Sequence, residues 1–272
     1  MMKDLVLDGY GKLVKVNLGG TGEMYALQYN GNNYLYKPAL RKNTTIVEPF
    51  RGIVQECAYR VQDIVDSESA IWCRYIENES SCGALQLRID VAPRSRNYYW
   101  FRDDDDFTPE EVNQFMREFV TDYLLYNYDA HGNNFITGKD GIIRGIDKEQ
   151  SFRYINDPDS AKLSVDYAPN SVRYFEDEPI YNKIFKRYRD GKLDIDFNVI
   201  SHYMDKVDCF DYDEYRNIFV PYCKACQASF GADSQAMLDK IVERKVNMRS
   251  NVEAFFQQLT EERENSLGGR KR

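Results

Sequence analysis

Residues 127–134 read NYDAHGNN, a polar stretch that separates two segments with clear secondary-structure signals. The segment before it, 108–124, begins with TPEE, a capping box with proline at the first helical position, and continues with apolar residues at helical spacing. The segment after it, 135–147, has two short strand patterns around a glycine-containing turn and ends at Asp147. The sequence therefore predicts a helix, a polar loop and a β-hairpin, in this order.

Strand patterns dominate residues 1–90, and helical patterns dominate the chain beyond about residue 177. In the first part we expect one helix at 47–65 and strands at 12–18, 24–29, 34–37, 70–75 and 84–89. The order of these elements predicts an α+β fold with two lobes and a cleft between them. We place the N-terminal lobe at 1–90, the C-terminal lobe at 91–265 and a flexible tail at 266–272.

The composition argues against several classes of protein. A hydrophobic fraction of 43% excludes wholesale disorder, and a formal net charge of −8 argues against broad binding of nucleic acid. No apolar run approaches the roughly 20 residues of a membrane span, and the acidic start is unlike a secretion signal. The six cysteines fit no disulfide framework, and Cys223 and Cys226 are expected on successive turns of a buried helix. We therefore expect a cytoplasmic protein without nucleic-acid partners.

The strand-rich lobe offers candidates for holding a phosphate chain. The turn between its first two strands contains three glycines, Gly19, Gly20 and Gly22. Lys37 on the third strand is the candidate anchor for nonreacting phosphates. Glu56 on the following helix is its candidate partner, with Glu48 as the competing carboxylate. Each feature also has a structural explanation: a glycine-rich hairpin turn, an edge-strand lysine facing solvent and a surface glutamate.

The polar loop and the hairpin offer candidates for the reaction itself. Asp129 and Asn134 have the D-x-x-x-x-N spacing of a kinase catalytic loop. Asp147, at the end of the hairpin, is expected to meet Asn134 across the strand ends. Asp and Asn are also common turn residues, and His131 can serve simply to pin the loop by hydrogen bonding. The joint appearance of these residues with Lys37 nevertheless favours phosphoryl transfer.

Three short motifs resemble the HipA-like and phosphatidylinositol 3-/4-kinase-like branch of the kinase superfamily. Residues 127–134 resemble the N-x-D-x-H-x-x-N loop of HipA-type kinases and the D-R-H-x-x-N loop of the lipid kinases. Residues 146–152, IDKEQSF, resemble the metal-binding segment of these families, and residues 34–38, YLYKP, are similar to their ATP-lysine strand. Together these motifs support an architecture that covers roughly residues 12–152, and the helices beyond match in general character only.

This resemblance implies a protein-kinase-like fold and an ATP- and Mg²⁺-dependent phosphotransferase, with Mn²⁺ as an alternative metal. Asp129 is then the catalytic acid/base, and Asn134 and Asp147 are the metal ligands. Lys37 anchors the phosphates, and His131 supports the loop and the transferred phosphate.

The sequence also departs from the family pattern. Lys148 and Glu149 stand where Phe-Gly often follows the metal-binding Asp, which puts a switch based on a flipping phenylalanine in doubt. Ala130 stands where the lipid kinases carry Arg. A chain of 272 residues has no room for the accessory domains of these families, so we expect a stand-alone minimal catalytic module.

A protein Ser or Thr hydroxyl is the expected acceptor. An acidic chain without a basic amphipathic helix is poorly suited to an anionic phosphoinositide membrane. A lipid kinase, an AMP transferase that binds ATP in reverse and a non-catalytic nucleotide-binding module remain the alternatives. The arginine- and tyrosine-rich segment 94–102 could recognise an acidic peptide or a base, or could be an exposed loop. The basic cluster at 183–189 could bind a phosphorylated ligand, or could be a solvated helix face.

Overall fold

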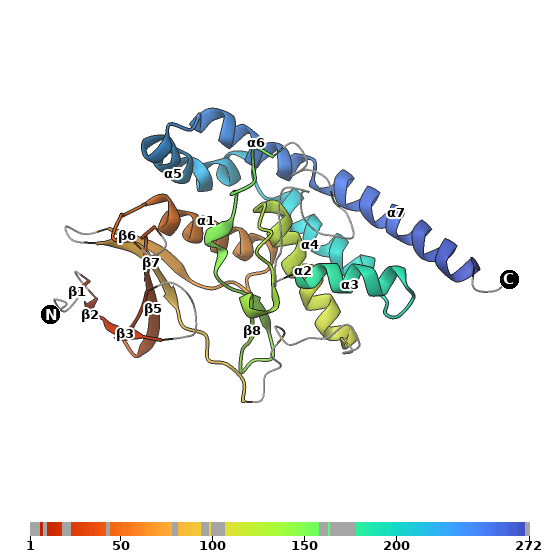
Figure 1. Cartoon of the computed structure of the whole chain (residues 1–272), viewed down its shortest axis with the longest axis horizontal. Helices are drawn as coiled ribbons and strands as arrows, with labels where there is room; N and C mark the ends of the chain where they lie inside the picture. The colour runs from red at the N-terminus through yellow and green to blue at the C-terminus, as the bar shows by residue number, and fades with distance from the viewer. Residues whose placement is uncertain are drawn as a thin grey trace.

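The computed structural model describes most of the chain, and Figure 1 shows a strand-rich N-terminal part beside a helical C-terminal part. The described residues are 6–7, 10–17, 23–41, 44–77, 81–93, 98, 107–157, 163 and 178–269. None of the helices in these ranges has the length and apolar character needed to cross a membrane.

The N-terminal part is built on a five-stranded antiparallel sheet with the order β3-β4-β5-β7-β6. Its strands are β3 (Val14–Val16), β4 (Met24–Tyr29), β5 (Asn32–Pro38), β6 (Cys73–Glu77) and β7 (Cys82–Leu87). The tight turn between β4 and β5 has Asn30 and Gly31 at positive φ, as a two-residue hairpin turn requires. The strands β1 (Val6–Leu7) and β2 (Gly11–Lys12) form a separate pair.

Helix α1 (Phe50–Val65) connects the sheet to the helical part. Gly52 allows a close approach to the sheet, because a Cβ there would lie 2.9 Å from the Tyr75 ring and 3.0 Å from the Gly83 carbonyl carbon. On its other side α1 shares a hydrophobic core with the C-terminal helices, and the Cys57 thiol donates a hydrogen bond to the carbonyl oxygen of Ile218. The sheet and the helical part are therefore joined through a buried helix.

Helix α2 (Pro109–Leu124) is the central helix of the second part. It begins with the predicted capping box: the Thr108 side chain accepts from the Glu111 backbone N–H, and the Glu111 side chain accepts from the Thr108 N–H. Its buried rings Phe115 and Phe119 pack edge-to-face against aromatic residues of the hairpin and of other helices. The remaining helices are α3 (Ile180–Arg189), α4 (Phe197–Cys209), α5 (Tyr212–Phe230), α6 (Ser234–Val246) and α7 (Met248–Gly269).

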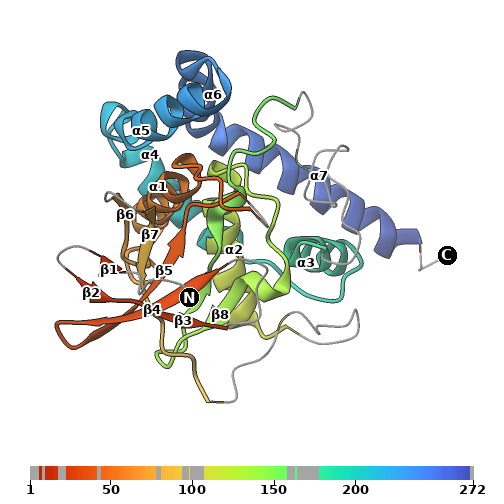
Figure 2. The same cartoon turned by 60° about the vertical axis from the view of Figure 1, so that its left-hand side comes forward.

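The hairpin strands β8 (Phe135–Thr137) and β9 (Ile143–Gly145) follow α2 and lie between the sheet and α3 in both views (Figures 1 and 2). Two single-turn helices flank the hairpin: η2 (Gly132–Asn134) before it and η3 (Lys148–Gln150) after it. The hairpin thus places residues 129–149 opposite the N-terminal sheet.

These elements confirm the predicted α+β fold, with an antiparallel N-terminal sheet, one helix beside it and a helical C-terminal part that contains the hairpin. Strands β6 and β7 are shifted by two or three residues from the expected ranges 70–75 and 84–89, and further details differ. Helix α1 begins at Phe50 and not at Val47, because Val47 forms a β-bridge with Leu40. The pair β1–β2 was not predicted. Helix α7 continues to Gly269, so it includes the first residues of the predicted tail.

Candidate active site

The backbone reverses direction immediately after the hairpin. The Ile146 N–H donates to the carbonyl oxygen of Asn134 at 2.7 Å, which places the loop 129–134 beside the end of β9. Asp147 then adopts a left-handed conformation with φ of 53°, which is uncommon for a residue other than glycine. The short η3 turn follows at once. This turn directs the side chains of Asp147 and Glu149 toward the sheet.

Lys37 of β5 meets both of these carboxylates. Its Nζ lies 2.6 Å from Asp147 Oδ1 and 3.0 Å from Glu149 Oε2, and its side chain is only 15% exposed. Burial by itself lowers the pKa of Lys37, but the two carboxylates outweigh burial and raise the pKa above its ordinary value. The lysine is therefore a cation at neutral pH, held at the junction of the two parts of the molecule.

The loop 129–134 brings a carboxylate and an amide together. The Asn134 Nδ2 donates to the carbonyl oxygen of Asp129 at 2.6 Å, so the amide oxygen of Asn134 is the atom left to face a cation. The Asp129 side chain is 40% exposed, and His131 Nε2 lies 3.6 Å from its Oδ1. Asp129 is thus accessible to a substrate, whereas Asn134 is buried against the loop.

A buried carboxylate ties this loop to the residue after Asp147. Asp122 of α2 accepts hydrogen bonds from Asn127 Nδ2 at 2.8 Å and from Lys148 Nζ at 2.6 Å. Asn127 in turn accepts from the Asp129 backbone N–H at 3.3 Å. Lys148 and Asp122 are almost fully buried, so the pair is shielded from solvent. Neither the role of Asp122 nor the burial of Lys148 was predicted from the sequence, because periodicity identifies apolar faces and not buried charges.

The expected partners of Lys37 have other contacts. Glu56 accepts from the Tyr75 backbone N–H at 2.8 Å and lies 3.3 Å from Arg74. The predicted ion pair between Glu56 and Lys37 is therefore absent, because Glu56 is turned toward β6.

Glu48 is not the alternative partner either, since it pairs with Arg41 at 2.7 Å and Arg51 at 2.5 Å. Glu149 is instead the glutamate that pairs with Lys37.

The glycines Gly19, Gly20 and Gly22 lie outside the described residues.

The donor set suits a magnesium ion. Within the described ranges, no three His, Cys, Asp or Glu side chains converge as a metal cage. Mg²⁺ is commonly held by one or two carboxylates together with substrate phosphates and water, and it prefers oxygen ligands. Asp147 and the amide oxygen of Asn134 supply oxygen ligands of this kind from adjacent strand ends. The residues present therefore fit a Mg²⁺–nucleotide complex better than a metal bound by protein alone.

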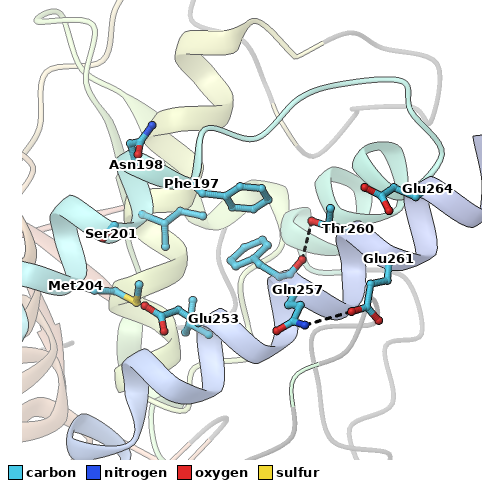
Figure 3. Close-up of a pocket in the computed structure, with 12 residues that line it drawn as sticks. Phe197, Asn198, Ser201, Met204, Glu253, Gln257, Thr260, Glu261 and Glu264 are labelled. Atoms are coloured by element: carbon cyan, nitrogen blue, oxygen red, sulfur yellow. Dashed lines mark hydrogen bonds between the residues drawn. The ribbon is translucent and has the colours of Figure 1, made fainter.

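Two hollows of the described surface lie away from this centre. One is an apolar groove of about 470 Å³ between α4 and α7, with Phe197 and Met204 on one side and Glu253 and Glu261 on the other (Figure 3). Another, of about 510 Å³, lies between α1 and β6. Neither is lined by Lys37 or Asp147. The candidate site is therefore identified by its chemistry and not by the volume of a cavity.

Two other sequence features have structural roles. Cys223 and Cys226 are buried on α5, as predicted, and the six cysteines are all free. In the basic cluster of α3, Arg187 is buried and Lys186 pairs with Glu178 at 2.7 Å. Most of segment 94–102 lies outside the described residues.

Comparisons with known proteins find similarity to solved structures and not to families or curated sequences. No protein-family model and no curated protein matches the chain. A similar solved structure is the crystal structure of a Helicobacter pylori proinflammatory kinase, CtkA, with a TM-score of 0.49 and 12% sequence identity. The match covers 86% of this chain and 92% of that chain. The geometry around Lys37 and Asp147, and not this likeness, carries the functional conclusion.

Proposed function

We propose that this protein is an ATP- and Mg²⁺-dependent phosphotransferase that moves the γ-phosphoryl group of ATP to a hydroxyl group. One observation carries the proposal: Lys37 Nζ of the sheet lies 2.6 Å from Asp147, 110 residues later in the chain, beside the loop that contains Asp129 and Asn134. Phosphoryl transfer requires a cation on the phosphates, oxygen ligands for a metal and a carboxylate for the accepting hydroxyl. The fold brings candidates for all three to one place.

Each residue has a distinct role in this proposal. Asp147 and Asn134 would hold the magnesium ion, which supplies positive charge to the phosphate oxygens when it is bound. Lys37 would bind the nonreacting phosphates. Asp129, which is partly exposed, would accept the proton of the attacking hydroxyl, and His131 beside it would orient that carboxylate.

The proposed acceptor is a Ser or Thr side chain of a protein. The resemblance of residues 127–134 to the loop of HipA-type kinases supports this choice. The net charge of −8 also disfavours approach to an anionic phosphoinositide surface.

Labelled ATP tests the proposal directly. The purified protein is incubated with Mg²⁺ and either γ- or α-labelled ATP, with casein and phosphatidylinositol vesicles as separate acceptors and Asp147→Ala as the control. We expect label from the γ position only, on the protein itself or on casein, and none with Asp147→Ala. Label from the α position would show AMP transfer, and label on the vesicles would show a lipid acceptor. Magnesium-dependent ATP binding without any transfer would favour a nucleotide-binding module.

A further inference from the structure

We infer that Glu149 is the carboxylate that positions Lys37 for the phosphates, in the role that a glutamate on helix α1 was expected to fill. This inference rests on the proposed function, because it concerns how the same site is organised. It assigns a positioning role to a residue that neither the motif spacing nor the family resemblance singled out.

The contacts of Lys37 support this assignment. Lys37 has two carboxylate neighbours, Asp147 at 2.6 Å and Glu149 at 3.0 Å. In the proposed function Asp147 is a metal ligand, so its carboxylate is shared with a cation that competes with the lysine. In the proposed function Glu149 is not a metal ligand. It can therefore keep the ammonium group in place when Asp147 binds the metal.

Glu149 is itself anchored to helix α1. Its Oε1 lies 3.9 Å from Arg51 Nη1, while its Oε2 faces Lys37. Arg51 is in turn held by Glu48, which also pairs with Arg41. A row of charges with alternating sign thus leads from the start of α1 to Lys37, through Glu48, Arg51 and Glu149. Helix α1 is connected to Lys37 through Arg51 and Glu149, and not through a glutamate of its own.

The turn after the hairpin fixes the direction of Glu149. The side chain of Lys148 enters the core and is bound by Asp122, whereas the neighbours Asp147 and Glu149 both face Lys37. The left-handed Asp147 and the η3 turn make this alternation possible. Lys148 and Glu149 follow Asp147, where the kinases that the sequence resembles often have Phe-Gly. The inference gives each residue a role: Lys148 fastens the loop and Glu149 holds Lys37.

The test compares three glutamine substitutions that each remove one carboxylate charge. Glu149→Gln removes the inferred partner, and Glu56→Gln removes the partner expected from the sequence. Glu68→Gln is the control, since Glu68 is exposed. Binding of a fluorescent ATP analogue with Mg²⁺ is titrated for each variant, and KM for ATP and kcat are measured where turnover is found. Circular dichroism melting checks that each variant is folded.

We expect Glu149→Gln to weaken binding of the ATP analogue about fivefold to tenfold and to raise KM more than it lowers kcat, since a partly exposed charge-assisted contact is lost. Glu149→Asp should recover part of the affinity, and Glu68→Gln should bind as the wild type does. Unchanged or tighter binding by Glu149→Gln, or a larger loss with Glu56→Gln, would overturn the inference. Failure of the wild type to bind Mg²⁺–ATP would instead contradict the proposed function.

Discussion

The residues of the candidate site differ in how strongly their substitution is expected to affect nucleotide binding. Lys37 and Asp147 form the contact between the sheet and the hairpin, and Asn134 is fixed by the Asp129 carbonyl oxygen. Asp129 differs because its carboxylate is 40% exposed, and in the proposed function it contacts the acceptor and not the nucleotide. A change at Asp129 should therefore affect transfer and not ATP affinity.

We predict that Asp129→Asn lowers kcat by about 10²-fold or more, the range found when a general base is removed, with the Kd for Mg²⁺–ATP within about threefold of wild type. The isosteric amide keeps the size of the side chain but removes the proton-accepting charge. Phosphorylation rates and a binding titration on the same preparation give both numbers. An Asp129→Asn variant with full kcat would show that another group accepts the proton.

At the scale of elements, helix α2 and the turn η3 are fastened to each other by buried charges. Glu118 and Asp122 are fully buried on α2, and Lys148 of η3 is the cation beside them, at 3.7 Å and 2.6 Å. Gly145 makes room for this contact, because a Cβ there would lie 2.6 Å from Glu118 Oε2. The helix that precedes Asp129 and the turn that follows Asp147 are therefore joined by one ionic cluster.

We predict that Lys148→Met lowers the free energy of unfolding by about 3–5 kcal/mol, because it leaves the Asp122 carboxylate buried without its cation, whereas Glu118 keeps Arg117 at 3.3 Å. Urea unfolding followed by circular dichroism measures this loss. Lys139→Met is the matched control, since Lys139 pairs with Asp90 in a contact that is more than half exposed and should change stability by about 1 kcal/mol or less. Equal stability of Lys148→Met and the wild type would mean that the cluster does not hold η3 in place.

The sequence predicted some of these elements better than it predicted their contacts. The capping box and the apolar stripe correctly predicted the limits of helix α2. The turn signals correctly predicted the hairpin that ends before Asp147. These are local features, and local spacing is enough to predict them. The partner of Lys37 is a tertiary feature. Because Glu48, Glu56 and Glu149 are chemically alike, the sequence alone could not show which one the folded chain brings to the lysine.

In the whole molecule, the site lies between the sheet and the helical part, and each of these has a hydrophobic core of its own. One core fills the helical part and includes the inner face of α1, with residues such as Val54 and Val61. A smaller core covers one face of the sheet and includes Tyr36. Because side chains alternate along β5, burial of Tyr36 in the smaller core turns Lys37 toward the hairpin. The predicted lobe boundaries near residues 90 and 265 remain predictions.

We propose that the two parts of the molecule together form one Mg²⁺–ATP site at Lys37 and Asp147. Isothermal titration of ATP into the wild type and into Asp147→Asn, each with Mg²⁺ and with EDTA, tests it most directly. We predict that the wild type binds ATP at least about tenfold more tightly with Mg²⁺ than without it, a difference of about 1.4 kcal/mol, and that Asp147→Asn loses this dependence. Equal affinity in all four titrations, or no binding by the wild type, would contradict the claim.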